Sequence, residues 1–284
     1  MKISRLFSIT SLSIFYVAGI ITASAQFTSI ADNFSNNGNL VGSTPDSGVG
    51  DWTQIASTST SALVVSNGAV TILAGSNQNA QLNFSSGNLS SGTIYVGFDL
   101  TVASGSISGT SGSISTFFGF RSGTPASGSY ELGFGLFRPN ATAQGNGALS
   151  TTTSQFQFGF GDGTSLSNGG NRWGSISTVD TQYRVVMSWN LDTDTAALWI
   201  NPTSSSSTSI TATGLTGTTR GIYIRQGSGT HGQSSLSDLK VSLDFDTAAN
   251  LTAVPEPSTY AAILGGIALI GVVAIRRRKR ATVA

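Results

Sequence analysis

Carboxylates are the first residues of this chain to consider for chemistry, because a pair of them can cleave a glycosidic bond. A retaining glycosidase holds two carboxyl groups about 5 Å apart, and on a strand two such groups share a face at even spacing. Residues 26–253 contain a single glutamate, Glu131, and the nearest acids on either side of it are Asp99 and Asp162. No closely spaced partner accompanies Glu131, so the sequence argues against a glycosidase of the usual kind.

Nucleophilic and thiol chemistry also lack their usual residues. The chain has no cysteine and one histidine, His231, which lies in the glycine-rich segment 227–232. An exposed loop position is the ordinary interpretation of such a histidine. No Gly-x-Ser-x-Gly motif places a serine on a sharp turn, and zinc would lack cysteine and histidine ligands. We therefore expect no catalytic residue and no metal site of these kinds.

Two aspartate positions are candidates for calcium, a hard cation that prefers oxygen ligands. Asp192-Thr193-Asp194 joins two strand-like segments, where aspartate ordinarily serves the turn itself. Asp162-Gly163 belongs to a loop rich in glycine and asparagine, residues 161–170. Turn chemistry is the preferred interpretation of the first pair, and no cofactor is expected.

The end of this loop is the best candidate for a ligand-binding site. Asn171, Arg172 and Trp173 follow the loop, and Asp162 lies at its start. A tryptophan offers a flat apolar face to a sugar ring, while Asn, Asp and Arg supply directional hydrogen bonds. These four residues are therefore candidate glycan-binding residues. The alternative is that Trp173 points into the core.

Short alternating segments separated by turn residues predict an all-β fold. Asn67-Gly68, the strongest short turn signal, separates two apolar segments, and residues 190–194 separate another two. Strands are expected at 63–65, 70–73, 93–102, 115–120, 130–137, 155–160, 183–189, 195–200, 221–225 and 239–245. No helical period and no fixed-period repeat is present, which favours an antiparallel two-sheet sandwich or jelly roll over a propeller.

Tryptophans and glycines within these segments have expected structural roles. Three tryptophans in strand-like contexts are expected in the core, namely Trp52, Trp189 and Trp199. Glycines recur within or beside aromatic strands, and no helix follows them, so they are not phosphate loops. We expect bulges or close strand contacts at these glycines, namely Gly119, Gly133, Gly135, Gly159 and Gly161.

Residues 1–25 have the three regions of a secretory signal peptide. Lys2 and Arg5 give a positive start, a largely apolar stretch follows, and Ala23-Ser24-Ala25 is a small-residue site, so cleavage before Gln26 is expected. A first transmembrane helix is the alternative, which the small-residue site disfavours. The signal implies export by the Sec machinery.

Charge excludes nucleic acid as a partner. Residues 26–253 contain seven basic and twelve acidic side chains, a net charge of −5, and no basic cluster. Nucleic-acid affinity depends on neutralising phosphates, so this domain is a poor candidate for it. About 230 residues can bury a large core without disulfides.

The chain from Val254 onward combines a rigid turn, an apolar run and a basic cluster. Prolines fix an extended backbone in Val254-Pro255-Glu256-Pro257. Residues 258–275 carry no charge and would span about 27 Å as a helix, close to a bilayer core of about 30 Å. The bases Arg276-Arg277-Arg278-Lys279-Arg280 would remain on the cytoplasmic side. We therefore expect a transmembrane helix at about 258–275, with an exposed motif in front of it.

Pro255-Glu256-Pro257, the apolar span and the basic terminus, in this order, resemble the PEP-CTERM sorting signal of Gram-negative bacteria. The resemblance covers about thirty residues, 254–284. It implies recognition by an exosortase, a membrane cysteine protease or transpeptidase that removes the tail after transient anchoring in the inner membrane. The alternative is an ordinary anchor that is never cleaved. Residues 248–253 are expected to link the tail to the domain.

Residues 26–247 resemble the concanavalin A-like (laminin-G-like) domains of exported bacterial proteins. The resemblance rests on hydrophobic pattern and a few polar positions: Asp32-Asn33-Phe34, Gly38-Asn39-Leu40, Gly50-Asp51-Trp52, residues 183–189, residues 197–202 and residues 236–241. It implies two packed antiparallel sheets, and another β-sandwich is the alternative.

These observations together predict an exported, non-enzymatic protein of the cell envelope or extracellular matrix. Its role would be structural or glycan-binding, with an exopolysaccharide as the candidate partner. The alternative is an extracellular polysaccharide-active enzyme with an atypical aspartate site. A matrix spacer without a small ligand is a third interpretation.

Overall fold

The computed structural model describes most of the domain between the two terminal signals. The described residues are 27–48, 50–55, 62–73, 78–105, 114–124, 126–137, 154–162, 165–166, 171–215, 217–226 and 233–251. The expected signal peptide, the sorting tail with its expected membrane helix, and His231 all lie outside them. Within the described ranges, no helix has the length and apolar character needed to cross a bilayer.

The described strands form two large antiparallel sheets and one small one. Sheet A has the order β17 (Ile210–Thr213), β16 (Thr195–Ile200), β15 (Gln182–Asn190), β7 (Thr93–Val102), β19 (Ser234–Ser242), β5 (Ala69–Ile72), β4 (Val64–Ser66) and β2 (Gly38–Asn39), with β1 (Ile30–Asp32) also paired to β19. Sheet B has the order β13 (Asn171–Arg172), β11 (Gln155–Asp162), β10 (Tyr130–Phe137), β9 (Phe118–Arg121), β18 (Gly221–Arg225), β6 (Asn79–Asn83) and β3 (Thr53–Gln54), with β14 (Ser177–Thr178) paired to β11. Strands β8 (Ile114–Ser115) and β12 (Ser165–Leu166) make the small sheet.

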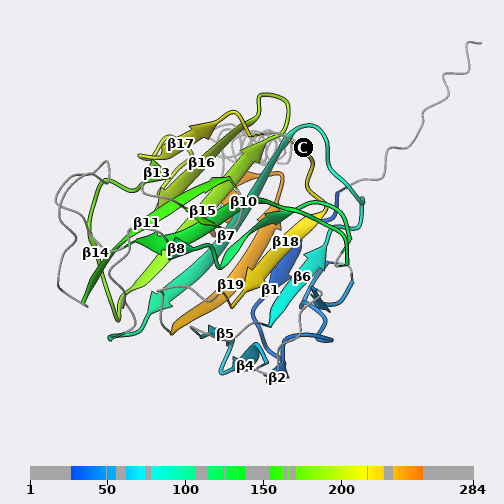
Figure 1. Ribbon diagram of the computed structural model, residues 1–284, viewed down its shortest axis with the longest axis horizontal. Helices are drawn as coiled ribbons and strands as arrows, with labels where there is room; N and C mark the ends of the chain where they lie inside the picture. The colour runs from blue at the N-terminus through cyan, green and yellow to red at the C-terminus, as the bar shows by residue number, and fades with distance from the viewer. Residues whose placement is uncertain are drawn as a thin grey trace, which may run out of the picture.

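The two large sheets stack face to face, and Figure 1 looks onto the stack. In β7, every second residue from Ile94 to Val102 is fully buried. The ring of Phe98 in this strand meets that of Phe118 in β9, with centroids 4.4 Å apart. Alternate side chains of the two sheets therefore interdigitate in one core, as in a β-sandwich. The predicted all-β two-sheet sandwich is confirmed.

The turns and tryptophans expected from sequence take their predicted places. Asn67 and Gly68 both have positive φ, 53° and 77°, as a type I′ hairpin turn between β4 and β5 requires. The second predicted hairpin is β15–β16. Trp52 and Trp189 are fully buried, and Trp199 is 8% exposed. The core assignment of these three tryptophans is confirmed.

The folded domain extends past the boundary expected from sequence. Residues Phe245–Ala248 form a helix, α1, and Ala248 and Ala249 are buried. The backbone N–H of Leu251 donates to the carbonyl of Asp246 at 2.9 Å. Residues 248–251 therefore pack as part of the domain, which corrects their assignment to the linker. Four residues are too few for a helical period, so the sequence pattern did not reveal α1.

A buried carboxylate joins the first strand to the core. Asp32 is 3% exposed, and its two oxygens accept hydrogen bonds from the backbone N–H of Phe34 at 2.8 Å and from Trp52 Nε1 at 2.8 Å. Burial raises the pKa of Asp32, and the hydrogen bonds from Trp52 and Phe34 act in the opposite direction. Both oxygens therefore face donors, and an amide in this position would turn its NH₂ group toward one of them.

Replacing Asp32 with Asn should lower the free energy of unfolding by about 2 kcal/mol, because one oxygen becomes an NH₂ group that faces a donor. Between pH 3.8, the ordinary value, and the raised pKa, the folded chain binds more protons through Asp32 than the unfolded chain does. The contribution of Asp32 to stability is thus largest below pH 3.8 and falls as pH rises through the raised pKa. Urea unfolding of wild type and variant across this pH range measures both effects.

Asp192→Asn is the matched control, because Asp192 is exposed and accepts one backbone hydrogen bond, from the N–H of Gly92 at 3.0 Å. It should cost less than about 1 kcal/mol. Equal losses in the two variants would contradict a special role for the buried carboxylate.

Candidate functional site

Paired glycines line the face of sheet B that points away from the core between the sheets. Gly133 in β10 lies opposite Gly119 of β9 on one side and Gly161 of β11 on the other, and Gly135 lies opposite Gly159. A Cβ on Gly119 would lie 1.9 Å from the carbonyl oxygen of Leu132. A Cβ on Gly159 would lie 2.1 Å from the ring of Phe137. The predicted close strand contacts at Gly119 and Gly159 are confirmed.

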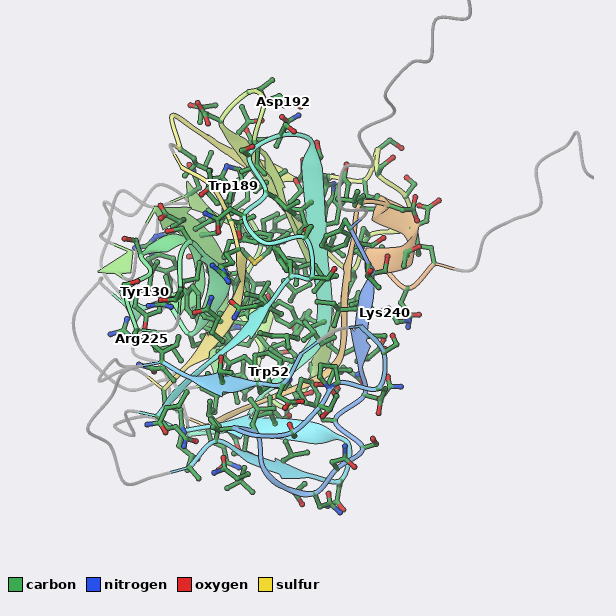
Figure 2. The ribbon with its side chains drawn as sticks, turned by 90° about the vertical axis from the view of Figure 1, so that its right-hand side faces the viewer. Trp52, Tyr130, Trp189, Asp192, Arg225 and Lys240 are labelled. Atoms are coloured by element: carbon green, nitrogen blue, oxygen red, sulfur yellow. The ribbon has the colours of Figure 1, made fainter. Side chains whose placement is uncertain are left out.

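A tyrosine and two arginines gather on this face beside the paired glycines. The guanidinium carbon of Arg121 lies 5.2 Å from the centroid of the Tyr130 ring, and that of Arg225 lies 5.5 Å from it. The ring of Tyr223 meets that of Tyr130 edge-on, with centroids 4.7 Å apart. Figure 2 shows Tyr130 and Arg225 next to each other at the side of the molecule. We call Tyr130, Tyr223, Arg121 and Arg225 the Tyr130 cluster.

The members of the Tyr130 cluster differ in how far they reach solvent. Tyr223 is fully buried, and its hydroxyl lies 2.9 Å from Thr116 Oγ1. Tyr130 and Arg225 are half-buried. Burial raises the pKa of both tyrosines, and the two arginines oppose this effect at Tyr130. Both phenols are therefore neutral donors at neutral pH, and Tyr130 is the one that an external molecule can reach.

Arg121 has a structural role within the cluster. It is 3% exposed and donates to Gln81 Oε1, to the carbonyl of Thr124 at 2.8 Å and to that of Gly128 at 2.7 Å. The bonds to Thr124 and Gly128 close the turn that connects β9 to β10, and the bond to Gln81 ties this turn to β6. Burial lowers the pKa of Arg121, although an arginine remains charged at physiological pH. Arg121 is thus held in place by the fold, and its guanidinium packs against the ring of Tyr130.

Sequence reasoning missed the Tyr130 cluster because its members come from three different strands. Tyr130 and Arg121 are partners in the β9–β10 register, and Arg225 is the last residue of β18. Strand pairing of this kind cannot be read from local patterns. The one signal in the sequence was the tyrosine at the start of an aromatic strand.

The predicted glycan-binding residues lie on or directly after two paired strands, β11 and β13, and the described side chains differ in exposure. Asn171 is exposed, whereas Arg172 is 7% exposed and its guanidinium carbon lies 4.0 Å from the Phe137 ring centroid. Trp173 is half-buried and packs against the core. The backbone of Asp162 ends β11, but its side chain lies outside the described residues. Arg172 is thus buried against Phe137, whereas Asn171 and part of Trp173 remain on the surface.

The candidate calcium ligands at residues 192–194 lie in the turn of the β15–β16 hairpin. Asp192 accepts the hydrogen bond from Gly92, and Asn190 Oδ1 accepts from the backbone N–H groups of Asp192 and Thr193. Asp194 has a φ of 52°. Within the described residues, no three acidic or histidine side chains gather in a way that could hold a metal ion. Asn190 therefore serves the turn itself, whereas the Asp192 carboxylate joins the turn to the residue before β7.

The described carboxylates that converge are held by an arginine. Asp99 and Asp238 both lie within ion-pair distance of Arg184 Nη1, at 3.2 and 3.0 Å. Glu131, the residue tested first for catalysis, accepts a hydrogen bond from Ser122 Oγ. Each of these carboxylates therefore has a partner within the fold.

Comparison with known families identifies a sorting motif in the C-terminal part of the chain. Residues 253–279 match the family model described as "PEP-CTERM protein-sorting motif". This stretch is a PEP-CTERM sorting signal. Such a signal implies export, processing by an exosortase and an envelope or extracellular location. No curated protein matches the chain as a whole.

Solved structures align with this chain at low similarity. A chain described as "Sialidase" aligns over 69% of this chain and 17% of its own length, with 10% identity and a TM-score of 0.39. A Bacillus licheniformis beta-glucanase aligns over 75% and 97%, with 12% identity and a TM-score of 0.38. Lectin I-B4 from Griffonia simplicifolia aligns over 76% and 98%, with 10% identity and a TM-score of 0.39. They include enzymes and a lectin, so they do not decide whether this chain is catalytic.

Proposed function

We propose that this PEP-CTERM protein is a non-catalytic component of the bacterial envelope or extracellular matrix, with a structural or glycan-binding β-sandwich. The observation that carries the proposal is a sorting signal at residues 253–279 of a chain whose described residues form a two-sheet sandwich. The described acids that approach one another are engaged in structural contacts, which supports a domain that does not hydrolyse its ligand.

Sorting in this proposal follows the order of the signals along the chain. The N-terminal signal directs Sec export, and the apolar run then holds the protein in the inner membrane with the basic cluster inside. The exosortase recognises the segment around Pro255-Glu256-Pro257, cuts the chain and releases or transfers the domain. Gram-negative bacteria are the expected hosts of this pathway.

Glycan binding in this proposal uses accessible aromatic rings of sheet B. Tyr130 presents a half-buried ring next to a guanidinium, and Trp173 presents part of an indole next to exposed Asn171. Flat rings stack on sugars, and the adjacent polar groups fix orientation. The two surfaces are separate candidates, and each can be removed by a single substitution.

Replacing Tyr130 or Trp173 with Ala should weaken binding to an exopolysaccharide by about tenfold, because a stacked ring contributes about 1 kcal/mol or somewhat more. A glycan array of neutral and acidic polysaccharides, probed with residues 26–251, identifies the ligand, and calorimetry then compares the variants. Tyr130→Phe is the matched control, because it keeps the ring and should keep most of the affinity.

A hydrolysis screen on the same protein tests the absence of catalysis. Turnover of a polysaccharide would replace the proposal with the alternative of an enzyme that uses an atypical aspartate site. Unchanged affinity in both alanine variants would dismiss the two surfaces. An array without any bound glycan would leave the structural role, that of a matrix spacer.

A further inference from the structure

The last described residues of the domain are held on the outer face of sheet A. Phe245, Ala248 and Ala249 are buried there against Val186 and Trp199. The ring of Phe245 meets those of Trp199 and Tyr95 edge-on, with centroids 5.1 and 5.7 Å apart. This apolar cluster is separate from the main core between the sheets. Residues 244–251 therefore have a docking surface of their own, and we call them the latch.

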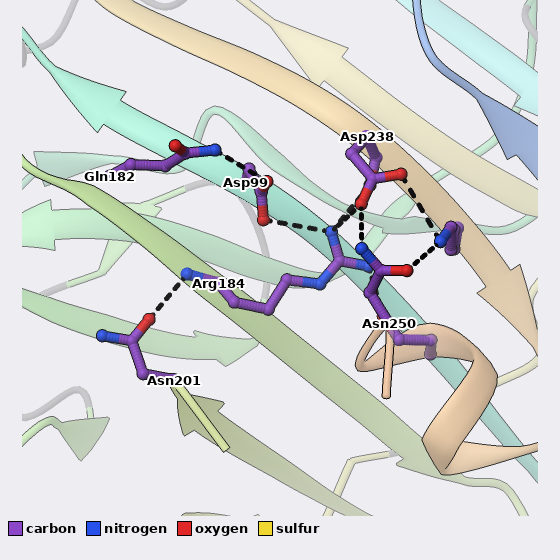
Figure 3. A network of polar contacts seen from close by, with 8 residues as sticks. Asp99, Gln182, Arg184, Asn201, Asp238 and Asn250 are labelled. Atoms are coloured by element: carbon purple, nitrogen blue, oxygen red, sulfur yellow. Dashed lines mark hydrogen bonds and ion pairs between the residues drawn. The ribbon is translucent and has the colours of Figure 1, made fainter. Parts of the chain in front are cut away.

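One arginine joins the latch to three strands, and Figure 3 shows its ion pairs with Asp99 and Asp238. Arg184 of β15 donates through Nη1 to Asp99 Oδ1 of β7 at 3.2 Å and to Asp238 Oδ2 of β19 at 3.0 Å. Its other terminal nitrogen, Nη2, donates to the carbonyl of Ala248 in the latch. The Arg184 side chain is 11% exposed, so water screens these bonds poorly.

A second set of polar bonds holds the end of the latch. Asn250 Nδ2 donates to Asp238 Oδ2 at 2.8 Å, and Lys240 Nζ donates to Asn250 Oδ1. Asp238 has a φ of 45° and lies in the interruption of the β19 ladder between Ser237 and Lys240. Asp238 thus stands out from the sheet at the point where it can bind both Arg184 and Asn250.

A glycine in sheet A allows the backbone of the latch to lie close to the sheet. Gly97 lies at the centre of β7, opposite Val186 and Lys240 in the neighbouring strands. A Cβ on this glycine would lie 1.8 Å from the carbonyl oxygen of Ala248 and 2.9 Å from Arg184 Nη2. Only glycine at this position lets the latch and the guanidinium reach each other.

The helix of the latch ends in a hydrogen-bonded C-cap. The N–H of Asn250 donates to the carbonyl of Thr247 at 3.2 Å, that of Leu251 donates to Asp246, and Asn250 has a φ of 59°. This is the Schellman arrangement, with asparagine in the left-handed position and an apolar residue after it. The fold is therefore fixed up to Leu251.

Only three residues separate Leu251 from the first proline of the sorting motif. They are 252–254, and four Cα–Cα steps lead from Leu251 to Pro255. These steps span at most about 14 Å, whatever their conformation. With the latch released, the eleven steps from Asp244 to Pro255 span up to about 38 Å. A processing enzyme binds an extended peptide along its backbone, so the latched domain leaves it little chain before the motif.

We propose that the latch limits access of the processing enzyme to the sorting motif, and that Arg184 is the positioning residue that keeps the tether short. The proposal rests on processing of the sorting signal. Opening of the latch, while the sandwich stays folded, frees residues 244–251 and lets the enzyme engage the motif. The rate of processing then depends on the fraction of molecules with an open latch.

Pulse-chase labelling of the full chain, in cells that contain the exosortase, tests the proposal with two variants. Arg184→Met keeps the apolar stem but removes the bonds to Ala248 and Asp238. The second variant inserts six Gly/Ser residues after Leu251 and leaves the latch intact. Both should raise the initial rate of tail removal by about tenfold, as expected when a competent minor state becomes a major one. Combining the two changes should add little, because both supply the same free chain.

Controls separate tether length from stability and from insertion as such. Asp32→Asn loses stability through the bonds of its carboxylate to Phe34 and Trp52, neither of which belongs to the latch, and it should be processed at the wild-type rate. The same six residues inserted between Ser205 and Ser206, in an exposed loop, should also leave the rate unchanged. Hydrogen exchange at the amides of residues 248–251 should speed up in Arg184→Met and stay slow in the insertion variant after Leu251.

The outcomes distinguish this proposal from the sorting function. Wild-type chain processed at the same rate as the insertion variant would overturn the latch proposal and leave sorting intact. A faster rate in Asp32→Asn equal to that in Arg184→Met would also overturn it, because general destabilisation would then suffice. Wild-type chain that is never processed would overturn both.

Discussion

Ending the chain at Ala253 is expected to abolish its sorting while leaving its domain folded. The truncated protein lacks the match to the sorting motif and the apolar run, so nothing holds it at the membrane for the exosortase. The described fold ends at Leu251, before the cut, so the thermal midpoint of the domain should change by less than about 2 °C. Cell fractionation and mass spectrometry of the C-terminal peptide measure location and processing together.

A variant with Pro255 and Pro257 replaced by Ala separates recognition from anchoring. It keeps the apolar run and the basic cluster, so it should remain in the membrane with its tail uncut. A truncated chain that still reaches the usual location in the usual amount would refute the sorting role. A wild-type mature chain that still ends at Ala284 would instead support an uncleaved anchor.

The sorting signal could be recognised from sequence because its information is linear. Order, length and composition of the Pro-Glu-Pro turn, the apolar run and the basic cluster suffice, and no long-range contact enters. The same holds for β7, whose predicted range 93–102 equals the observed Thr93–Val102. A ten-residue alternation leaves one choice of buried face. Local patterns therefore specified the long strands, but β6 and β17 were not predicted, and the strand expected at 239–245 is observed at Ser234–Ser242.

The polar sites could not be predicted, because they depend on register between distant strands. Arg184 meets Asp99 across a strand pair and reaches Ala248 only because Gly97 leaves room between them. Arg172 was predicted on the surface, yet a two-residue strand has no alternation to show which way it points. Its position is decided by Phe137, a ring on a neighbouring part of sheet B.

The glycines of sheet B were recognised by type, but their importance is set by strand separation. Gly119 shows this best, since its missing side chain permits β9 and β10 to approach where their register shifts between Tyr130 and Leu132. The same approach places Tyr130 beside Tyr223, which lies opposite Gly119 in β18. Both the core beneath and the candidate glycan surface above therefore depend on this glycine.

Replacing Gly119 with Ala should lower the free energy of unfolding by about 3 to 4 kcal/mol, close to the upper end for single substitutions. The added Cβ would lie 1.9 Å from the carbonyl oxygen of Leu132 and 2.9 Å from its carbonyl carbon, so backbone must move in a packed sheet. Urea unfolding measures the loss.

Gly87→Ala is the matched control, because its φ is 76° and no atom lies within 4 Å of the new Cβ. It carries the backbone strain alone, about 1 kcal/mol. Equal losses of unfolding free energy in the two variants would mean that β9 and β10 can separate without cost. The close contact at Gly119 would then contribute neither to stability nor to the position of Tyr130.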